Sequence, residues 1–212
     1  MQIHLQHIIP QPLAEKDLSV SDIWNKEITF KAGEHIHVHA PSGIGKSTLI
    51  HILYGLRKDY EGALSFNNKR IKIRASYISN MRKKNISVVF QDMRLFPSLT
   101  GLENLTVKNS LTNFTSDDVI KNMMQQLGVE HLLQKTANTM SLGEQQRIAI
   151  IRSLLQPFNW LLLDEPFSHL DNNNIEKAKA LIIQTCKKNN AGMCITTLGE
   201  TYDMFFHKSL NL

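Results

Sequence analysis

With 212 residues, 42% of them hydrophobic and 20% charged, the chain has the size and composition of a soluble globular domain with a sizeable core. Its formal net charge of +5 favours anionic partners such as nucleotides, lipid headgroups or nucleic acid, without selecting among them. No stretch approaches the roughly 18 apolar residues that span a bilayer, and the N-terminus lacks the pattern of a signal peptide.

The two cysteines and the short basic clusters indicate where in the cell the chain is expected. Cys186 and Cys194 match no metal-binding or disulfide spacing and are expected to be buried free thiols. Short basic clusters at 69–74 and 82–84 are typical of solvated faces. The chain is therefore expected in a reducing cytoplasm, where any role at a membrane requires a partner.

The first predicted elements in chain order are short strands within residues 28–40, separated by a turn at 31–34. The second strand runs directly into a glycine-rich loop. After Lys46, apolar residues recur at a helical spacing that ends near Gly55. A strand, a glycine-rich loop and a helix in this order form the context that a phosphate-binding loop requires.

The glycine-rich loop, residues 40–48, departs from the usual phosphate-loop pattern only at its first position, where Ala40 replaces glycine. Its backbone N–H groups and the following helix N-terminus would form an anion cradle. A methyl group at position 40 costs little if φ is negative and about 1 kcal/mol if φ is positive. The alternative is a chance Gly/Ser turn before a helix. The candidate nucleotide-binding residues are Ser42, Gly43, Ile44, Gly45, Lys46, Ser47 and Thr48.

Within this loop, side chains and glycines have different expected roles. Lys46 supplies a point charge for the terminal phosphates, and the Ser47 hydroxyl can ligate Mg²⁺. Gly43 and Gly45 let the backbone approach the phosphates closely.

The rest of the chain alternates strands and helices. In order, the predicted elements are a strand at 86–92, helices at 115–128 and 143–156, a strand at 160–166, a helix at about 172–188 and a strand at 193–197. The run at 160–166 is continuously apolar until its end, as expected of a central parallel strand buried on both faces. This alternation predicts an α/β fold in which residues of about 95–155 form a helical insertion.

Asp164 and Glu165 follow this central strand, at the edge where an open α/β sheet binds its ligand. Asp164 is a candidate Mg²⁺ ligand, and Glu165 is a candidate general base that polarises the attacking water. Alone, such a pair is also common in turns. Combined with the phosphate loop, it indicates a nucleotide hydrolase.

The segment "MSLGEQQR" (140–147) resembles the Leu-Ser-Gly-Gly-Gln/Glu signature of ABC ATPases. The order of motifs also resembles that family: the phosphate loop, "FQD" with Gln91, the signature, "LLLDEP" and "SHLD" (168–171). The likeness covers almost the whole chain. A small nucleoside or shikimate-type kinase would share only the phosphate loop. Ser141 and Glu144 also fit a helix capping box, which is compatible with a functional role.

The resemblance implies a P-loop NTPase fold of the ABC ATPase type. Its features would be a mainly parallel core sheet, an N-terminal antiparallel β subdomain and a helical subdomain. Residues 1–212 would form a single domain, divided into a nucleotide-binding core (1–94 and 156–212) and the helical part (about 95–155).

The resemblance also implies a head-to-tail dimer, homodimeric or heterodimeric, with each ATP between the phosphate loop of one chain and the signature of the other. Ser141, Gly143 and Glu144 would then contact nucleotide in trans. Gln91 would act beside Glu165 as a catalytic residue and join Ser47 and Asp164 as a magnesium ligand. Ser168 and Asp171 would lie at the dimer seam.

Departures from the family pattern predict a slow enzyme. Leu142 replaces the first signature glycine, and Leu198 replaces the switch histidine, so a polar contact to the γ-phosphate is lost. Residues 8–22 contain no aromatic ring to stack on adenine, and Trp24 is expected within the following strand. The chain is expected to bind Mg-ATP and to hydrolyse it slowly without assistance.

The leading interpretation is the ATP-binding subunit of an ABC transporter, peripheral on the inner face of the cell membrane and working with separate integral membrane subunits. Residues 89–105 resemble the same region in small cassettes of lipoprotein-release, macrolide-export and cell-division systems. The alternative is a soluble, non-transport ABC ATPase that acts on nucleic acid or in an assembly pathway. No nucleic-acid partner is expected under the leading interpretation. Cargo and transport direction stay open.

Overall fold

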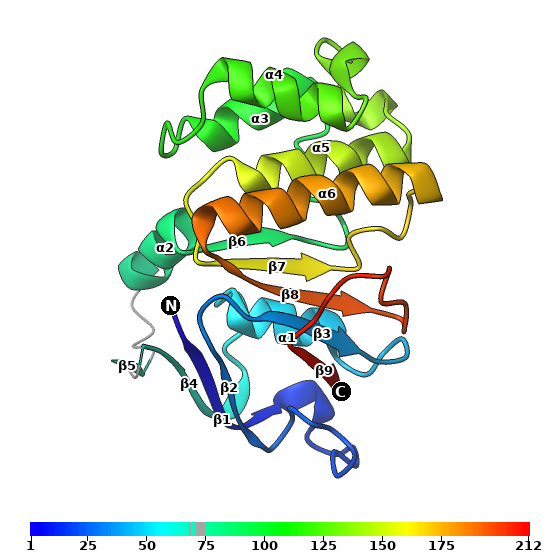
Figure 1. Ribbon diagram of the computed structural model, residues 1–212. Helices are drawn as coiled ribbons and strands as arrows, with labels where there is room; N and C mark the ends of the chain where they lie inside the picture. Colours follow the sequence, from blue (N-terminus) through cyan, green and yellow to red (C-terminus); the bar gives the residue numbers. More distant parts are fainter. Residues whose placement is uncertain (68, 71–74) are drawn as a thin grey trace.

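Two β-sheets organise the computed structural model, which describes residues 1–67, 69–70 and 75–212 (Figure 1). The five-stranded sheet is parallel throughout, in the order β6-β7-β8-β3-β9. Its strands are β3 His35–His39, β6 Ile86–Val89, β7 Trp160–Asp164, β8 Gly192–Thr197 and β9 Lys208–Asn211. The four-stranded sheet is antiparallel, in the order β2-β1-β4-β5. Its strands are β1 Ile3–Pro10, β2 Glu27–Phe30, β4 Tyr60–Phe66 and β5 Lys69–Arg70.

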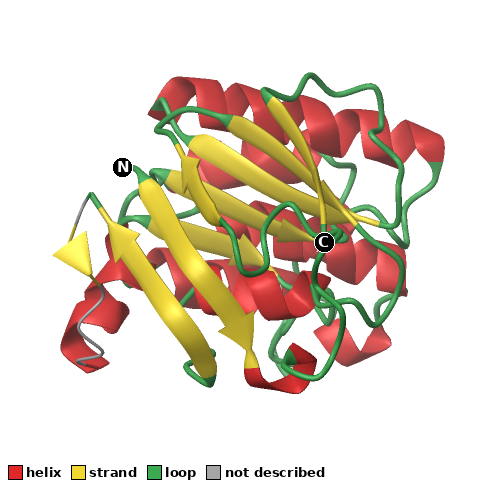
Figure 2. Ribbon diagram, turned by 90° about the horizontal axis from the view of Figure 1, so that it is seen from below, coloured by secondary structure: helices red, strands yellow, loops and turns green. Residues whose placement is uncertain are grey.

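Helices cover both faces of the parallel sheet (Figures 1 and 2). Helix α1 lies between the parallel and antiparallel sheets, α5 and α6 cover the opposite face, and α3 and α4 lie beyond α5. The helices are α1 Lys46–Leu53, α2 Ala75–Lys84, α3 Gly101–Asn109, α4 Asp117–Gln126, α5 Leu142–Leu154 and α6 Asn172–Asn189. Short 3₁₀ helices span Gln11–Leu13, Glu130–Leu132 and Ala137–Thr139. No described helix is both long and apolar enough to cross a bilayer.

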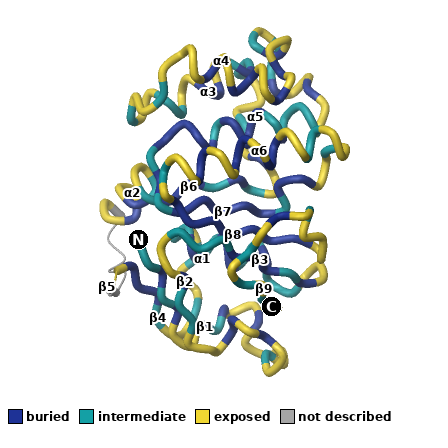
Figure 3. The backbone as a smooth tube through the Cα atoms, viewed as in Figure 1, coloured by how far each residue is buried: buried dark blue, intermediate teal, exposed yellow. Residues whose placement is uncertain are grey.

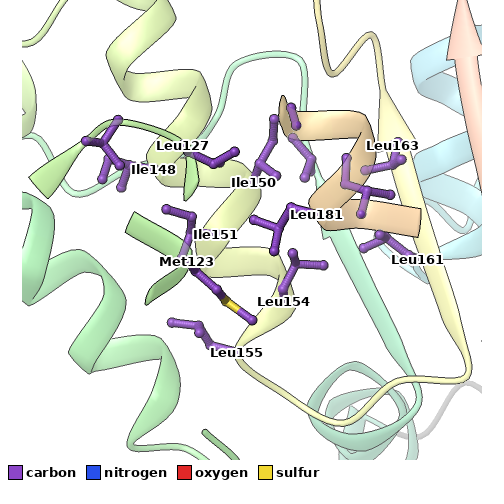
Figure 4. Packing of buried hydrophobic residues seen from close by; sticks show 14 of the residues in the cluster. Met123, Leu127, Ile148, Ile150, Ile151, Leu154, Leu155, Leu161, Leu163 and Leu181 are labelled. Atoms are coloured by element: carbon purple, nitrogen blue, oxygen red, sulfur yellow. The ribbon is translucent and has the colours of Figure 1, made fainter. Parts of the chain in front are cut away.

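Strand β7 lies between two hydrophobic clusters, and every one of its residues is buried (Figure 3). Leu161 and Leu163 pack into the cluster formed with α4, α5 and α6 (Figure 4). Leu162 packs on the other side, with α1 and the antiparallel sheet. This alternation follows from the period of two along a strand, and it confirms the prediction of a central strand buried on both faces.

The predicted α/β class is confirmed, and the parallel core and N-terminal antiparallel sheet match the expected P-loop NTPase architecture. Cys186 and Cys194 are free and buried, as predicted. Ser116 precedes α4 as its N-cap residue and makes no side-chain capping bond. The division into a core and a helical part at about 95–155 stays a prediction. Most of the basic cluster 69–74 falls outside the described residues.

Candidate functional site

The glycine-rich loop connects β3 to α1, and its backbone has the conformation that an anion cradle needs. Gly43 and Gly45 have φ values of 81° and 106°, a region that glycine enters without strain. Ala40 does not have a positive φ, so its methyl group causes no backbone strain. Helix α1 begins at Lys46, immediately after the loop, and its N-terminal N–H groups and dipole favour an anion there.

Gly45 is further restricted by two side chains behind the loop. A Cβ atom at this position would lie 2.9 Å from Leu13 Cδ1 and 3.4 Å from the Trp24 ring. Trp24 is fully buried and lies in the turn before β2, so the expectation that it falls within the strand is wrong. Trp24 directly precedes the residues of β2, but its contact with Gly45 is a tertiary contact that local sequence does not reveal. The indole therefore supports the phosphate loop from behind.

Lys46 is held at the mouth of the loop by oxygen atoms. Its ammonium donates to the carbonyl of Ala40 at 2.7 Å and to that of Pro41 at 3.2 Å. It also lies 3.3 Å from Glu165 Oε1, and its side chain is only 5% exposed. The ammonium is therefore fixed beside the cradle and paired with the candidate general base.

Glu165 connects this lysine to the end of β6. Gln91 Nε2 donates to Glu165 Oε2 at 3.4 Å, and Ser47 Oγ donates to Gln91 Oε1 at 3.4 Å. Glu165 has a φ of 46°, a strained conformation for a residue other than glycine. Strain of this kind persists only where the surroundings fix the backbone, and here the Glu165 N–H donates to the Thr196 carbonyl at 3.0 Å.

Asp164 is the last residue of β7 and is almost completely buried. Its Oδ1 accepts a hydrogen bond of 2.7 Å from Thr196 Oγ1 on β8. The loop after β3, Gln91 after β6, and Asp164 with Glu165 at the end of β7 thus meet at the carboxyl edge of one parallel sheet. Ligands of open α/β sheets bind at this edge.

Two cavities open beside these residues. One, of about 330 Å³, is lined by Gln91, Glu165 and the loop residues Ser42, Gly43, Gly45, Lys46, Ser47 and Thr48. The other, of about 270 Å³, includes Ser47, Gln91 and Asp164. Hydroxyl, amide and carboxylate oxygens therefore face one space, and this donor set fits a hard cation such as Mg²⁺. Ile44 lines neither cavity, because its side chain packs against the core.

The larger cavity is completed by residues that the sequence did not identify. Pro12 and Leu13 contribute an apolar wall from the stretch that has no aromatic ring to stack on adenine. Lys16 also lines this cavity and donates to the Gly43 carbonyl at 3.2 Å. These residues lie some thirty positions before the loop and belong to another segment of the fold. No helical or strand spacing therefore associates them with the loop in the sequence.

His51, which the sequence did not mark as a site residue, lines the smaller cavity. It lies on α1 one helical turn after Ser47, which places both on one face. Burial, and then the charge of Arg94, lowers the pKa of His51 below its usual value. The imidazole is therefore neutral at pH 7.

The signature segment forms the start of α5. Ser141 is the N-cap: its Oγ accepts from the Glu144 N–H at 3.3 Å, while Glu144 Oε2 accepts from the Ser141 N–H at 2.7 Å. The predicted capping box is confirmed. A Cβ atom on Gly143 would lie 2.8 Å from the His169 carbonyl oxygen, so only glycine fits there. Ser141, Gly143 and Glu144 line neither of the two cavities, so a single chain does not bring them to the phosphate loop.

Glu144 is strongly held as a carboxylate. Burial alone would raise its pKa, but hydrogen bonds from Ser141, His131 and Lys135 outweigh this and lower the pKa to about 2. The Glu144 oxygens lie 3.1 Å from His131 Nε2 and 3.0 Å from Lys135 Nζ. The helix start thus carries a fixed negative charge on its own side chain.

Gln146 is a further residue that the sequence did not identify. It is completely buried in α5, and its Nε2 donates to the Glu165 carbonyl at 3.2 Å. Its Oε1 accepts from the His169 N–H at 3.0 Å. The sequence signal that could have identified it is a polar residue among the apolar positions of the predicted helix. Through Gln146, the signature helix is joined directly to the backbone of the candidate base.

The two leucines that depart from the family pattern are exposed. The Leu142 side chain, at the first position of α5, is 53% exposed, and the Leu198 side chain, just after β8, is 56% exposed. Neither side chain has a group that can donate a hydrogen bond.

Comparisons with known proteins agree with this geometry. A family profile described as "ABC transporter" matches residues 24–168. The lipoprotein-releasing system ATP-binding protein LolD of Legionella pneumophila (strain Lens) is 33% identical over 175 residues, which cover 81% of this chain and 77% of LolD. The glucose import ATP-binding protein GlcV of Saccharolobus solfataricus is 30% identical over 84% of this chain, which spans only 50% of GlcV.

A solved structure is similar along nearly the whole chain. The dimeric structure of MJ0796, described as a bacterial ABC transporter cassette, has a TM-score of 0.82 and 25% sequence identity. The match covers 99% of this chain and 94% of the MJ0796 chain. Another structure of the same cassette, a dimeric post-hydrolysis state bound to ADP and Pi, has a TM-score of 0.83.

Proposed function

We propose, from the premise that this chain belongs to the ABC transporter family, that it is the ATP-binding subunit of a transporter and hydrolyses Mg-ATP. The observation that carries the proposal is the convergence of Lys46, Ser47 and Glu165 on one cavity beside a glycine cradle. The transporter's membrane subunits would be separate chains, and the domain would be peripheral on the inner face of the membrane.

The nucleotide would bind with its phosphates in the loop and its base toward Pro12 and Leu13. The N–H groups of the loop and Lys46 would bind the phosphate oxygens. Ser47, Gln91 and Asp164 would hold Mg²⁺, which when bound neutralises charge on the phosphates. Thr48, Ser42 and the Ile44 backbone complete the proposed phosphate contacts.

Glu165 would act as the general base by accepting a hydrogen bond from the attacking water. Its carboxylate pairs with Lys46 in this structure, and phosphate oxygens would compete for that ammonium. Release of the contact would free Glu165 Oε1 to face water. Gln91 would orient the carboxylate through the bond from its Nε2.

A second cassette would complete the site. Ser141, Gly143 and Glu144 lie at the start of α5, away from the phosphate loop of their own chain. MJ0796, which is similar along nearly the whole chain, is dimeric. The partner would be a second copy or a related chain.

Transport is favoured over the non-transport alternative because LolD, GlcV and the thiamine import protein ThiQ are all named as ATP-binding proteins of transport systems. Their cargoes and directions differ, so none of these carries over to this chain.

Hydrolysis by the isolated chain is proposed to be slow, since Leu198 cannot donate a hydrogen bond toward a γ-phosphate. The loss of one such donor typically reduces kcat by about 10²-fold.

The proposal is tested with the Glu165→Gln variant, which removes the base and preserves the shape of the site. We expect it to bind Mg-ATP without turning it over, and to shift from monomer to dimer when ATP is added, as measured by light scattering after gel filtration. A Lys46→Ala, Glu165→Gln double variant is the control and should remain monomeric. Failure of the wild-type chain to bind Mg-ATP in equilibrium dialysis would refute the function.

A further inference from the structure

The connection from β8 to β9 passes over β3 without forming a helix. Strands β8, β3 and β9 are neighbours in this order and run parallel, so the chain must return from the carboxyl edge to the amino edge before β9 begins. Residues 198–207, which we call the crossover loop, make this return (Figure 1). The structure describes all of them, and they form no helix or strand. His35, His37 and His39 share one face of β3, and the His207 N–H donates to the His35 carbonyl at 2.8 Å.

His37 is the buried centre of the contacts between β3 and the crossover loop. It is almost completely buried, with Nδ1 3.0 Å from Ser209 Oγ on β9 and Nε2 2.8 Å from Thr197 Oγ1 on β8. The Phe206 ring stacks on its imidazole, with centroids 5.0 Å apart and planes inclined by 24°. Burial, and then the charge of His39, lowers the pKa of His37 below its usual value. The ring is therefore neutral at pH 7 and has one donor and one acceptor nitrogen, each of which a hydroxyl can partner.

The Thr197 hydroxyl joins His37 to the first turn of the crossover loop. Its Oγ1 also accepts a hydrogen bond of 3.1 Å from the Gly199 N–H. Gly199 has a φ of 141°, which side-chain-bearing residues rarely adopt, and Leu198 lies between the two bonded residues. The Thr197 carbonyl accepts from the Ala40 N–H at 3.4 Å, at the start of the phosphate loop. The turn is thus fixed by a side chain from β3 and lies beside the nucleotide site.

The middle of the crossover loop contacts the segment that follows Glu165. The Tyr202 ring meets the Phe167 ring edge-on, with centroids 4.9 Å apart, and Phe167 is only two residues beyond Glu165. Burial, and then the charges of Glu200 and Glu165, raises the pKa of Tyr202, so its phenol lies within electrostatic reach of the proposed base. Tyr202 and Asp203 have φ values of 53° and 52°. Such strained conformations persist only where the surroundings fix the backbone.

We propose that His37 is a positioning residue for ATP hydrolysis, which fixes the crossover loop and thereby the backbone that carries Glu165. The proposal rests on the proposed function, in which Glu165 polarises the attacking water. The contact of Tyr202 with Phe167 carries the effect from the loop to this backbone. His37 lines neither nucleotide cavity, so it acts on the alignment of the base after binding and not on the binding of Mg-ATP.

The first test is Thr197→Val, which keeps the branched shape and removes the hydroxyl that joins His37 to Gly199. We expect kcat to fall about tenfold, because a displaced base slows the chemical step, while the Kd for Mg-ATP stays within about twofold. Phosphate release at saturating Mg-ATP gives kcat, and equilibrium dialysis gives Kd. His37→Leu should lower kcat by a similar factor. The double variant should fall no further, since both changes break the same link.

Two further variants separate positioning from packing. His37→Gln can place an amide near the position of Nε2, so it should keep about half of the wild-type kcat or more. Ser209→Ala is the matched control, because it removes the partner of the other ring nitrogen and leaves the bond to Thr197. It should keep the wild-type kcat. Equal losses of kcat in Ser209→Ala and Thr197→Val overturn the proposal, as does His37→Gln behaving like His37→Leu.

A second measurement needs no nucleotide. Hydrogen exchange of the Gly199 amide, followed by NMR, should be about tenfold faster in Thr197→Val and in His37→Leu than in the wild-type chain, and unchanged in Ser209→Ala. Unchanged exchange in Thr197→Val overturns the proposal. A wild-type chain that binds no Mg-ATP contradicts the proposed function itself. A wild-type chain that hydrolyses Mg-ATP no faster than Thr197→Val contradicts the role of His37 alone.

Discussion

Leu198 occupies the point where the chain leaves β8, close to the Thr196 residue that hydrogen-bonds Asp164. Leu198→His would place a hydrogen-bond donor at this position. We expect phosphate release to rise by about 10- to 100-fold, since one donor directed at a developing charge contributes this much. The measurement is the steady-state rate with saturating Mg-ATP.

Leu198→Phe is the control for this change, because it has a ring of comparable size without a donor. It should leave the rate at the wild-type level. If both variants accelerate hydrolysis equally, the missing hydrogen bond is not what limits the wild-type chain.

At the residue scale, the sequence identified site residues that belong to local motifs. It missed the residues that tertiary packing brings to the site from other segments. Lys46, Ser47 and Glu165 are fixed by the loop and the strand end that carry them, so their patterns predicted a shared site. Lys16 and Gln146 reach the site through tertiary packing. Their spacing from the motifs follows no helical or strand period, so only the three-dimensional structure associates them with the site.

At the scale of elements, the start of α5 depends on the charge of Glu144. Glu144→Gln keeps the shape of the capping box but loses the charged partner of His131 and Lys135. We expect it to lower the free energy of unfolding at pH 7 by about 1–3 kcal/mol, as measured by urea denaturation.

The effect has a defined pH dependence. Because the pKa of Glu144 is lowered from 4.5 to about 2 on folding, its contribution is complete above pH 4.5 and is lost as the pH falls toward 2. The difference between Glu144→Gln and the wild-type chain should therefore vanish near pH 2. A difference that is independent of pH would mean that packing, and not charge, is responsible.

Elements whose hydrophobic residues follow an uninterrupted helical or strand pattern were predictable from the sequence. Elements in which that pattern is interrupted were not. The uninterrupted apolar run of β7 and the helical spacing in α1 both corresponded to real elements. Strand β1 escaped prediction because its pairing with β4 shifts register between Gln6 and Ile9, and His7 takes a φ of 48°. A bulge of this kind interrupts the alternation on which strand prediction depends.

At the scale of the whole molecule, both hydrophobic clusters pack on the parallel sheet that carries the nucleotide site. Binding at the sheet edge should therefore stabilise the chain as one unit. At a concentration of about 100 times Kd, Mg-ATP is expected to add about 2.7 kcal/mol. For a chain of this size, that corresponds to a rise of about 5–10 °C in the thermal midpoint.

The shift should shrink when EDTA removes the magnesium and disappear in Lys46→Ala. Adenosine alone should produce almost none of it, because the cradle binds phosphate. A shift of equal size with adenosine would place the binding energy in the base and contradict the assignment of the loop.

The contact between Lys46 and Glu165 has a consequence for chains that have no bound nucleotide. The Lys46 ammonium contacts the Glu165 carboxylate in this structure, and in the proposed function it would contact phosphate once ATP binds. Under the proposed function, a chain without nucleotide would keep Glu165 paired with Lys46, and the binding of ATP would release it. Release of the proposed general base and binding of the substrate would then occur in the same step.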